Sequence, residues 1–133
     1  MNILVYSSWV FLINTIICYY YNYYLYSALF FTLFVSSIIH HTYYTDYTYV
    51  FDKIAIMMVV LYGGYVFYEK MTKLPISITS IIIVATFLST IVLYYFGYIS
   101  NQFCFDCDQD VAHIYHGFMH LLGCIGHVCI VIL

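Results

Sequence analysis

The chain has 133 residues and a formal net charge of −3, and 65% of its residues are hydrophobic while only 7% are charged. A water-soluble domain needs about a quarter charged residues to cover its surface, so this composition excludes an ordinary soluble protein. The excess of acids over bases excludes the basic surface that binds nucleic acid, so no nucleic-acid partner is expected. A lipid-facing surface needs no charge, and the bilayer is therefore the expected environment.

Apolar stretches long enough to cross a membrane follow one another along the chain, since a transmembrane helix needs about 20 such residues. The predicted spans, in chain order, are residues 3–20, 24–41, 51–68, 76–98 and 111–133. Between them lie a Tyr-Asn-Tyr break, a Thr- and Tyr-rich loop at 42–49, a Lys-containing turn and an acidic loop at 99–110. The sequence predicts an all-α fold, a polytopic transmembrane helix bundle of about five spans that forms a single domain over residues 1–133.

The few lysines give a predicted orientation. Lys70 and Lys73 lie between the third and fourth predicted spans, and cytoplasmic loops carry an excess of Lys and Arg. The C-terminus is therefore predicted to be cytoplasmic, and the N-terminus exoplasmic together with the loops 42–49 and 99–110.

Histidines inside the predicted spans indicate a metal site. His116 and His120 are four residues apart and share a helix face, a spacing at which two imidazoles can bind one ion. His41 on the second span supplies a third ligand, which completes the set that a catalytic zinc site uses beside an open position for water. Ser37 lies four residues before His41, on the same face.

Helix alternation places these residues at a similar depth. The second span ends on the side where the third span starts, with Asp52, and where the fifth span starts, with His113 and the His pair. Ionisable residues at membrane depth usually mark function. The open alternative is a purely structural cluster, in which each histidine hydrogen-bonds a neighbouring helix. That alternative is favoured for His40, which points about 100° away from His41.

The residues Ser37-Ile-Ile-His40-His41, then Asp52 and finally His116-Gly-Phe-Met-His120 resemble the signature of a known family. It is the alkaline ceramidase branch of the superfamily that also includes the adiponectin and progestin receptors. Its members have seven spans and a zinc ion held by three histidines, whereas this chain has five predicted spans. The match covers about 30 residues around the three motifs. A homo-oligomer that completes the bundle stays an open alternative.

The resemblance implies a role for each matching residue. His41, His116 and His120 would bind Zn²⁺, which lowers the pKa of its water to about 7. Asp52 would act as general base and then acid, and Ser37 would hydrogen-bond the water or the oxyanion. The substrate would be a lipid amide such as ceramide, so the implied enzyme is a zinc-dependent amidohydrolase.

Two other functions and one other motif stay open. The chain is alternatively a non-catalytic receptor-like protein or assembly factor that keeps zinc for structure, or a small transport protein that relays protons through the His–Asp cluster. Cys104 and Cys107 form a Cys-x-x-Cys pair in the acidic loop. They belong to an ordinary loop or, on an exoplasmic surface, form a disulfide. The sequence assigns no role to His113 beyond that of an outer or alternative ligand.

Overall fold

The computed structural model describes residues 3–133, and this range contains helices and no strand. The elements are α1 (Ile3–Ser7), α2 (Val10–Tyr20), α3 (Tyr24–Tyr43), α4 (Asp46–Met71), α5 (Ile78–Ile91), the π-helical segment η1 (Val92–Phe96), α6 (Gly97–Ser100), the 3₁₀ turn η2 (Phe103–Phe105) and α7 (Gln109–Ile132).

These elements combine into five segments that are long and apolar enough to cross a membrane. They are Ile3–Tyr20, Tyr24–Tyr43, Asp46–Met71, Ile78–Phe105 and Gln109–Ile132. The predicted all-α fold with about five spans is thereby confirmed, and the chain is an integral multi-pass membrane protein. The orientation of its termini stays a prediction.

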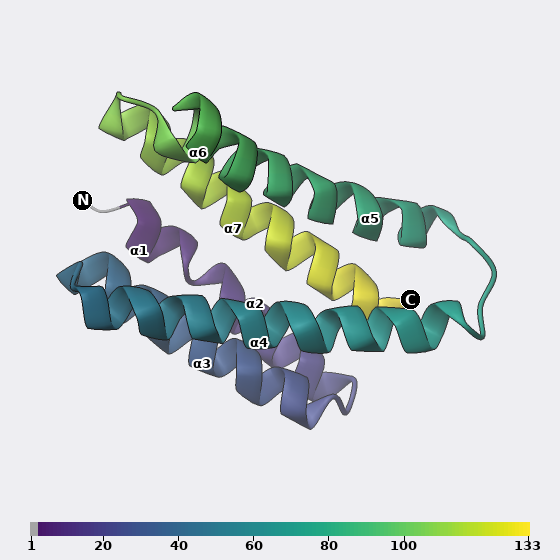
Figure 1. Cartoon of the computed structure of the whole chain (residues 1–133). Coiled ribbons are helices and arrows are strands. Elements are labelled where there is room, and N and C mark those ends of the chain that lie inside the picture. Colours follow the sequence, from purple (N-terminus) through teal and green to yellow (C-terminus); the bar gives the residue numbers. More distant parts are fainter. Residues whose placement is uncertain (1–2) are drawn as a thin grey trace.

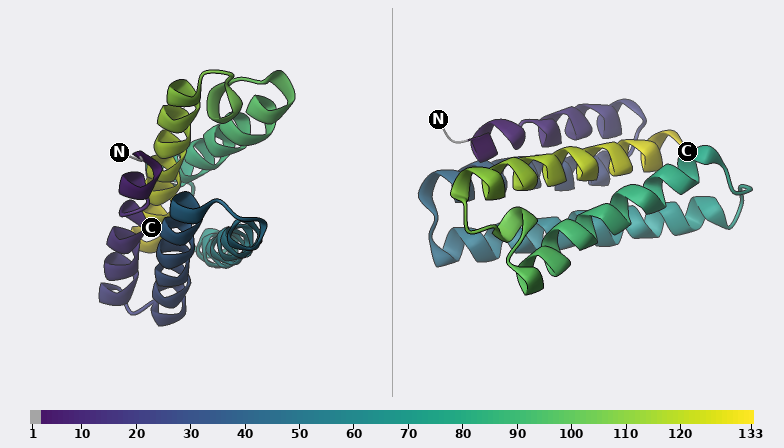
Figure 2. Two further views of the ribbon diagram at one scale, coloured as in Figure 1. Left: turned by 90° about the vertical axis from the view of Figure 1, so that its left-hand side faces the viewer. Right: turned by 90° about the horizontal axis from the view of Figure 1, so that it is seen from above.

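The helices form a bundle that is open on one side. The first three spans lie side by side in chain order, and α7 packs against α2 and α5 (Figures 1 and 2). The α1 segment lies against both α3 and α7. By contrast α4 and α5 diverge from the loop that joins them (Figure 1), and they do not pack on each other over any extended length. The start of α1, the α3–α4 turn and the start of α7 share one end of the bundle (Figure 1).

The first span is broken near that end. The hydroxyls of Ser7 and Ser8 both donate to the carbonyl oxygen of Leu4, at 3.1 and 2.8 Å. The backbone N–H of Trp9 then bonds to Tyr6, three residues back rather than four. Side-chain bonds of this kind compete with the helical ladder and bend it. The break separates α1 from α2 and turns both serines toward neighbouring spans.

The loop predicted at 42–49 is shorter in the structure, because only Tyr44 and Thr45 lie outside α3 and α4. Tyr44 ends α3 with a left-handed φ of 44°. Thr45 and Thr48 then form a reciprocal capping box, with each backbone N–H bonded to the other's hydroxyl at 3.0 and 3.2 Å. The cap starts α4 at Asp46, so Asp52 lies about 9 Å inside the helix rather than at its start.

The predicted loop at 99–110 is also shorter than expected. The fourth span continues through the π segment to Ser100, where Asn101 takes a left-handed φ of 53°. The 3₁₀ turn follows, and α7 starts at Gln109 with Asp108 as its cap, accepting the N–H of Asp110 at 2.9 Å. An Asp at this position satisfies a free N–H and complements the helix dipole.

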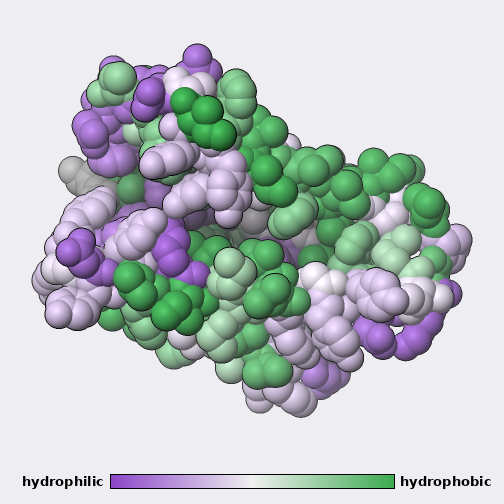
Figure 3. Space-filling model, viewed as in Figure 1, coloured by the Kyte–Doolittle hydropathy of each residue, from purple (hydrophilic) through white to green (hydrophobic). Residues whose placement is uncertain are grey.

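The outer surface suits lipid. Leu61 on α4 and Ile81 on α5 are 65% and 60% exposed, with many other large apolar side chains around them. Hydrophobic residues gather over the middle of the molecule and hydrophilic residues toward its ends (Figure 3). At the end away from the N-terminus, Lys70 donates two hydrogen bonds of 2.8 Å to the last carbonyls of α7. This lysine therefore caps the C-terminal dipole of that helix.

Close contact between α5 and α7 gives a stability prediction. A Cβ atom at Gly126 would lie 2.5 Å from the Thr86 hydroxyl, whereas a Cβ atom at Gly123 would meet nothing within 4 Å. We expect Gly126→Ala to lower the free energy of unfolding by about 1–3 kcal/mol, because the helices must separate. Gly123→Ala, one turn away, is the matched control and should be neutral or stabilising. Unfolding in detergent micelles, followed by circular dichroism, measures both; equal stability of the two variants would contradict the contact.

Candidate metal centre

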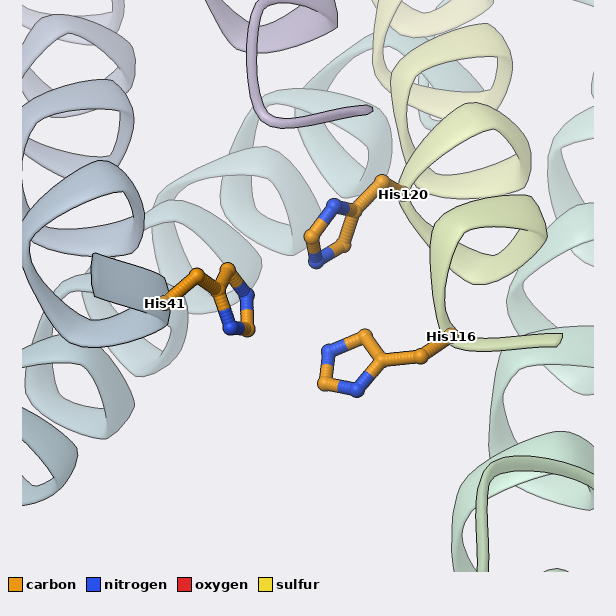
Figure 4. Close-up of side chains that lie close together, drawn as sticks. All are labelled: His41, His116 and His120. Atoms are coloured by element: carbon orange, nitrogen blue, oxygen red, sulfur yellow. The ribbon is translucent and has the colours of Figure 1, made fainter. Parts of the chain in front are cut away.

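Three histidines from two helices converge at the N-terminal end of the bundle. His41 lies in the last turn of α3, and His116 and His120 lie one turn apart on α7. One ring nitrogen of each can be chosen so that all three atoms lie within 4.8 Å of one another. The ring centroids are 4.9–5.5 Å apart. Figure 4 shows His41 facing the two histidines of α7 across the space between the helices.

The donor set and its surroundings fit a metal ion. Nitrogens bound to one tetrahedral zinc ion lie roughly 3.3 Å apart, so the three side chains must close inward by about 1 Å. Imidazole nitrogens suit zinc and several other divalent metals. His41 and His120 are buried, at 2% and 7% exposure, and His116 is half-buried. The arrangement could hold a metal ion with one side left open.

Two cavities border the histidine cluster, one on each side. A cavity of about 380 Å³ at the end of the bundle is bordered by His41 and His116 together with the 101–113 region. A second cavity, of about 650 Å³, is bordered by His120 and lies among α2, α3, α4, α5 and α7. Its lining is largely apolar. The histidine cluster therefore lies between a polar space near the membrane surface and an apolar space within the membrane.

Ser7 holds one of the three rings. Its hydroxyl lies 2.9 Å from Nδ1 of His120, and the Phe11 ring packs on the same imidazole with centroids 4.9 Å apart. Because Ser7 occupies Nδ1, the expected metal ligand of His120 is Nε2. The sequence prediction did not include Ser7. Helix alternation was the available signal, since it places the start of the first span at the same membrane face as the His pair.

Ser37 is buried, with 1% exposure, and lies one turn from His41 on α3. Its hydroxyl is 3.0 Å from that of Ser8 at the break in the first span. The two serines of the break thus contact two parts of the predicted site, Ser7 the His120 ring and Ser8 the Ser37 hydroxyl.

Asp52 is buried, with 3% exposure, but its side chain contacts other residues than the histidines that the motif predicts. Its Oδ1 accepts a hydrogen bond of 3.2 Å from Ser36, and its Oδ2 lies 3.8 Å from the Lys53 ammonium. Within residues 3–133, no hydrogen bond or ion pair joins Asp52 to the three histidines. It lies at the level of Ser36, about 7.5 Å deeper than His41 along α3.

The remaining histidines and the cysteine pair have other surroundings. Nδ1 of His40 lies 3.3 Å from the Thr48 hydroxyl, and its ring centroid is 5.1 Å from that of His41. His40 and His113 both border the smaller cavity. His127 forms a hydrogen bond with the Tyr26 hydroxyl deeper in the bundle. Cys104 and Cys107 are free thiols, so the structure contains no disulfide between them.

Comparison with known proteins adds no assignment: no protein-family model, no curated protein and no solved structure matches the chain.

Metal content tests the cluster directly. We expect the purified protein to carry about one divalent metal ion per chain and the double variant His116→Ala, His120→Ala to carry none, because one imidazole cannot hold the ion. His40→Ala, a histidine outside the cluster, is the matched control and should keep the metal. Elemental analysis by mass spectrometry gives the ratio. A wild-type protein without bound metal, or a double variant that retains it, would contradict the site.

Ser7 gives a second, finer test. Removing a group that orients a metal-binding histidine typically costs 10–100-fold in affinity, so we expect Ser7→Ala to weaken metal binding by about tenfold or more. Ser89→Ala is the control, because that hydroxyl bonds to the Ala85 carbonyl on the outer part of α5. Competition with a fluorescent chelator measures both affinities. An unchanged affinity in Ser7→Ala would show that the contact does not orient the ligand.

Proposed function

We propose that this protein is a zinc-dependent membrane hydrolase that cleaves the amide bond of a lipid. The observation that carries the proposal is the position of the three-histidine cluster at one end of a large apolar cavity, with His120 bordering that cavity. The apolar lining of this cavity suits the apolar acyl chain of a lipid amide. The motif resemblance to alkaline ceramidases supports the same reaction class.

The lipid would enter the cavity from the membrane through the gap between α4 and α5. Its chain would pack against residues such as Phe30, Val59 and Phe87. Because the chain comes from hydrocarbon rather than from water, shape-matched packing against these side chains stabilises the complex, and transfer out of water does not contribute. The amide group then lies near His120 at the end of the cavity. The smaller cavity on the other side, bordered by His41 and His116, gives water a route to the same place.

Hydrolysis adds the oxygen of water to the amide carbonyl carbon and breaks the carbon–nitrogen bond. The three histidines would hold a zinc ion, whose Lewis acidity would polarise the carbonyl and lower the pKa of water. Ser37 would turn its hydroxyl from Ser8, which lies 3.0 Å away, to donate a hydrogen bond to the oxygen that becomes negative.

Asp52 would accept the proton of water and return it to the leaving nitrogen, giving a fatty acid and an amine. Because this carboxylate lies about 7.5 Å deeper than His41, the proton would reach it through an intervening water molecule. Ser36 holds Oδ1 of this carboxylate, and Oδ2, which lies 3.8 Å from the Lys53 ammonium, is the oxygen that would accept the proton.

A non-catalytic role is the second candidate, and the position of Asp52 favours it. This carboxylate contacts Ser36 and Lys53 rather than the histidine cluster. On that account the metal ion joins α3 to α7 and stabilises the bundle, as a structural zinc ion does. Both candidates bind zinc, but only the hydrolase turns over a substrate.

The activity of Asp52 variants separates the two candidates. We expect Asp52→Asn to retain zinc and to lower hydrolysis of a fluorescent ceramide analogue about 100-fold or more, because the amide cannot accept the proton. Asp46→Asn, which removes an exposed carboxylate in the first turn of the same helix, should keep full activity. Release of the labelled fatty acid from protein in lipid nanodiscs is the measurement. Zinc-loaded protein without turnover, or with equal turnover in Asp52→Asn, would favour the structural role.

A further inference from the structure

The larger cavity is bordered by a histidine, His127, that the proposed hydrolysis does not use. Its polar lining side chains are Thr86, Thr90, His120 and His127. Both threonine hydroxyls donate to carbonyls of their own helix, at 2.9 and 2.7 Å. His120 belongs to the histidine cluster. His127 is therefore the one polar group whose presence in this cavity needs a separate explanation.

The His127 ring is held in a fixed position. Its Nδ1 forms a hydrogen bond with the hydroxyl of Tyr26, and the Phe30 ring packs on it with centroids 5.2 Å apart. Gly63 on α4 makes room for this arrangement, since a Cβ atom there would lie 2.7 Å from both Nδ1 and Cε1 of the imidazole. The Nδ1–Cε1 edge thus faces Tyr26 and Gly63. Nε2 follows Cε1 in the ring and lies beyond this edge, and the His127 side chain borders the cavity.

The hydrogen bond that His127 forms within residues 3–133 is that of Nδ1 with Tyr26, and the apolar side chains that line most of the cavity offer Nε2 no donor or acceptor. A polar atom left without a partner in such surroundings is costly, so a ligand group that satisfies it gains affinity. His127 follows His120 by seven residues on the same helix face, which separates the two rings by about 10 Å along the axis. One elongated ligand in this cavity can therefore reach both histidines.

We propose that the cavity selects a lipid chain that carries a hydroxyl group about 10 Å from its polar head, and that His127 binds this hydroxyl through Nε2. The proposal rests on the proposed function in one respect, namely that a lipid chain occupies the cavity with its head at the histidine cluster. A hydroxyl fits better than a carbonyl, because it both donates and accepts hydrogen bonds. It therefore satisfies Nε2 in either tautomer of the ring that Tyr26 holds.

The test compares three fatty acids of one chain length, carrying a hydroxyl near mid-chain, next to the carboxyl group, or nowhere. Their dissociation constants are measured by displacement of a fluorescent fatty acid from the full chain in nanodiscs. We expect the mid-chain hydroxy acid to bind about tenfold more tightly than the other two. His127→Phe should abolish this preference while still binding the unsubstituted acid, because the ring shape is kept and Nε2 is lost.

Thr90→Val is the matched control, since it removes a cavity-lining hydroxyl that is already bonded to its own helix, and it should keep the tenfold preference. Tyr26→Phe, which leaves Nε2 in place, serves if His127→Phe does not fold, and it should retain part of the preference. Equal affinity of the three acids for wild type, or a preference that survives in His127→Phe, would overturn the proposal. The measurement needs neither metal nor turnover, so absence of zinc or of hydrolysis would refute the proposed function without deciding this result.

Discussion

Polar side chains within a membrane-spanning bundle need hydrogen-bond partners inside the bundle, because the surrounding hydrocarbon offers none. For many of its polar side chains this chain meets that requirement with pairs that each join two different spans. The pairs are Ser7 with His120, Ser8 with Ser37, Asn14 with Cys124, Tyr26 with His127 and Ser36 with Asp52. Each such bond contributes on the order of 1 kcal/mol, and together they fix how the helices are rotated about their axes. The positions of the candidate site residues follow from this pairing.

The break in the first span has a particular place in that network. A regular helix would direct the adjacent residues Ser7 and Ser8 about 100° apart. Where the ladder shifts to three-residue spacing, one hydroxyl contacts His120 of α7 and the other contacts Ser37 of α3. The first span thereby connects the two helices that carry the histidine cluster. The break in this helix therefore occurs where the first span contacts the candidate metal centre.

The open face between α4 and α5 gives the bundle its second functional property. These helices are joined by a short loop yet diverge from it (Figure 1), and side chains of both border the larger cavity. The apolar cavity that results has His120 and His127 at different depths along α7. The space-filling view shows the surface indented between the two helices (Figure 3). A lipid can approach such a cavity from the membrane, while water approaches the histidine cluster from the end of the bundle.

The amino-acid sequence by itself determined the environment, the helical class and the spans, because the length and apolarity of each stretch decide whether it can cross a bilayer. It also determined which histidines share a face of α7, since residues four apart are neighbours on any helix. Helix ends were less predictable: the capping box of Thr45 and Thr48 extends α4 across a segment whose composition resembles a loop.

Only the tertiary structure decided which polar groups meet. In the structure His41 lies beside the His pair of α7, and Ser7 contacts His120. Asp52 accepts a hydrogen bond from Ser36. The physical reason is that periodicity fixes a side chain's direction relative to its own helix, whereas its partner depends on how each helix is rotated and how deeply it lies beside its neighbours. Those two quantities follow from packing and hydrogen bonding over the whole bundle.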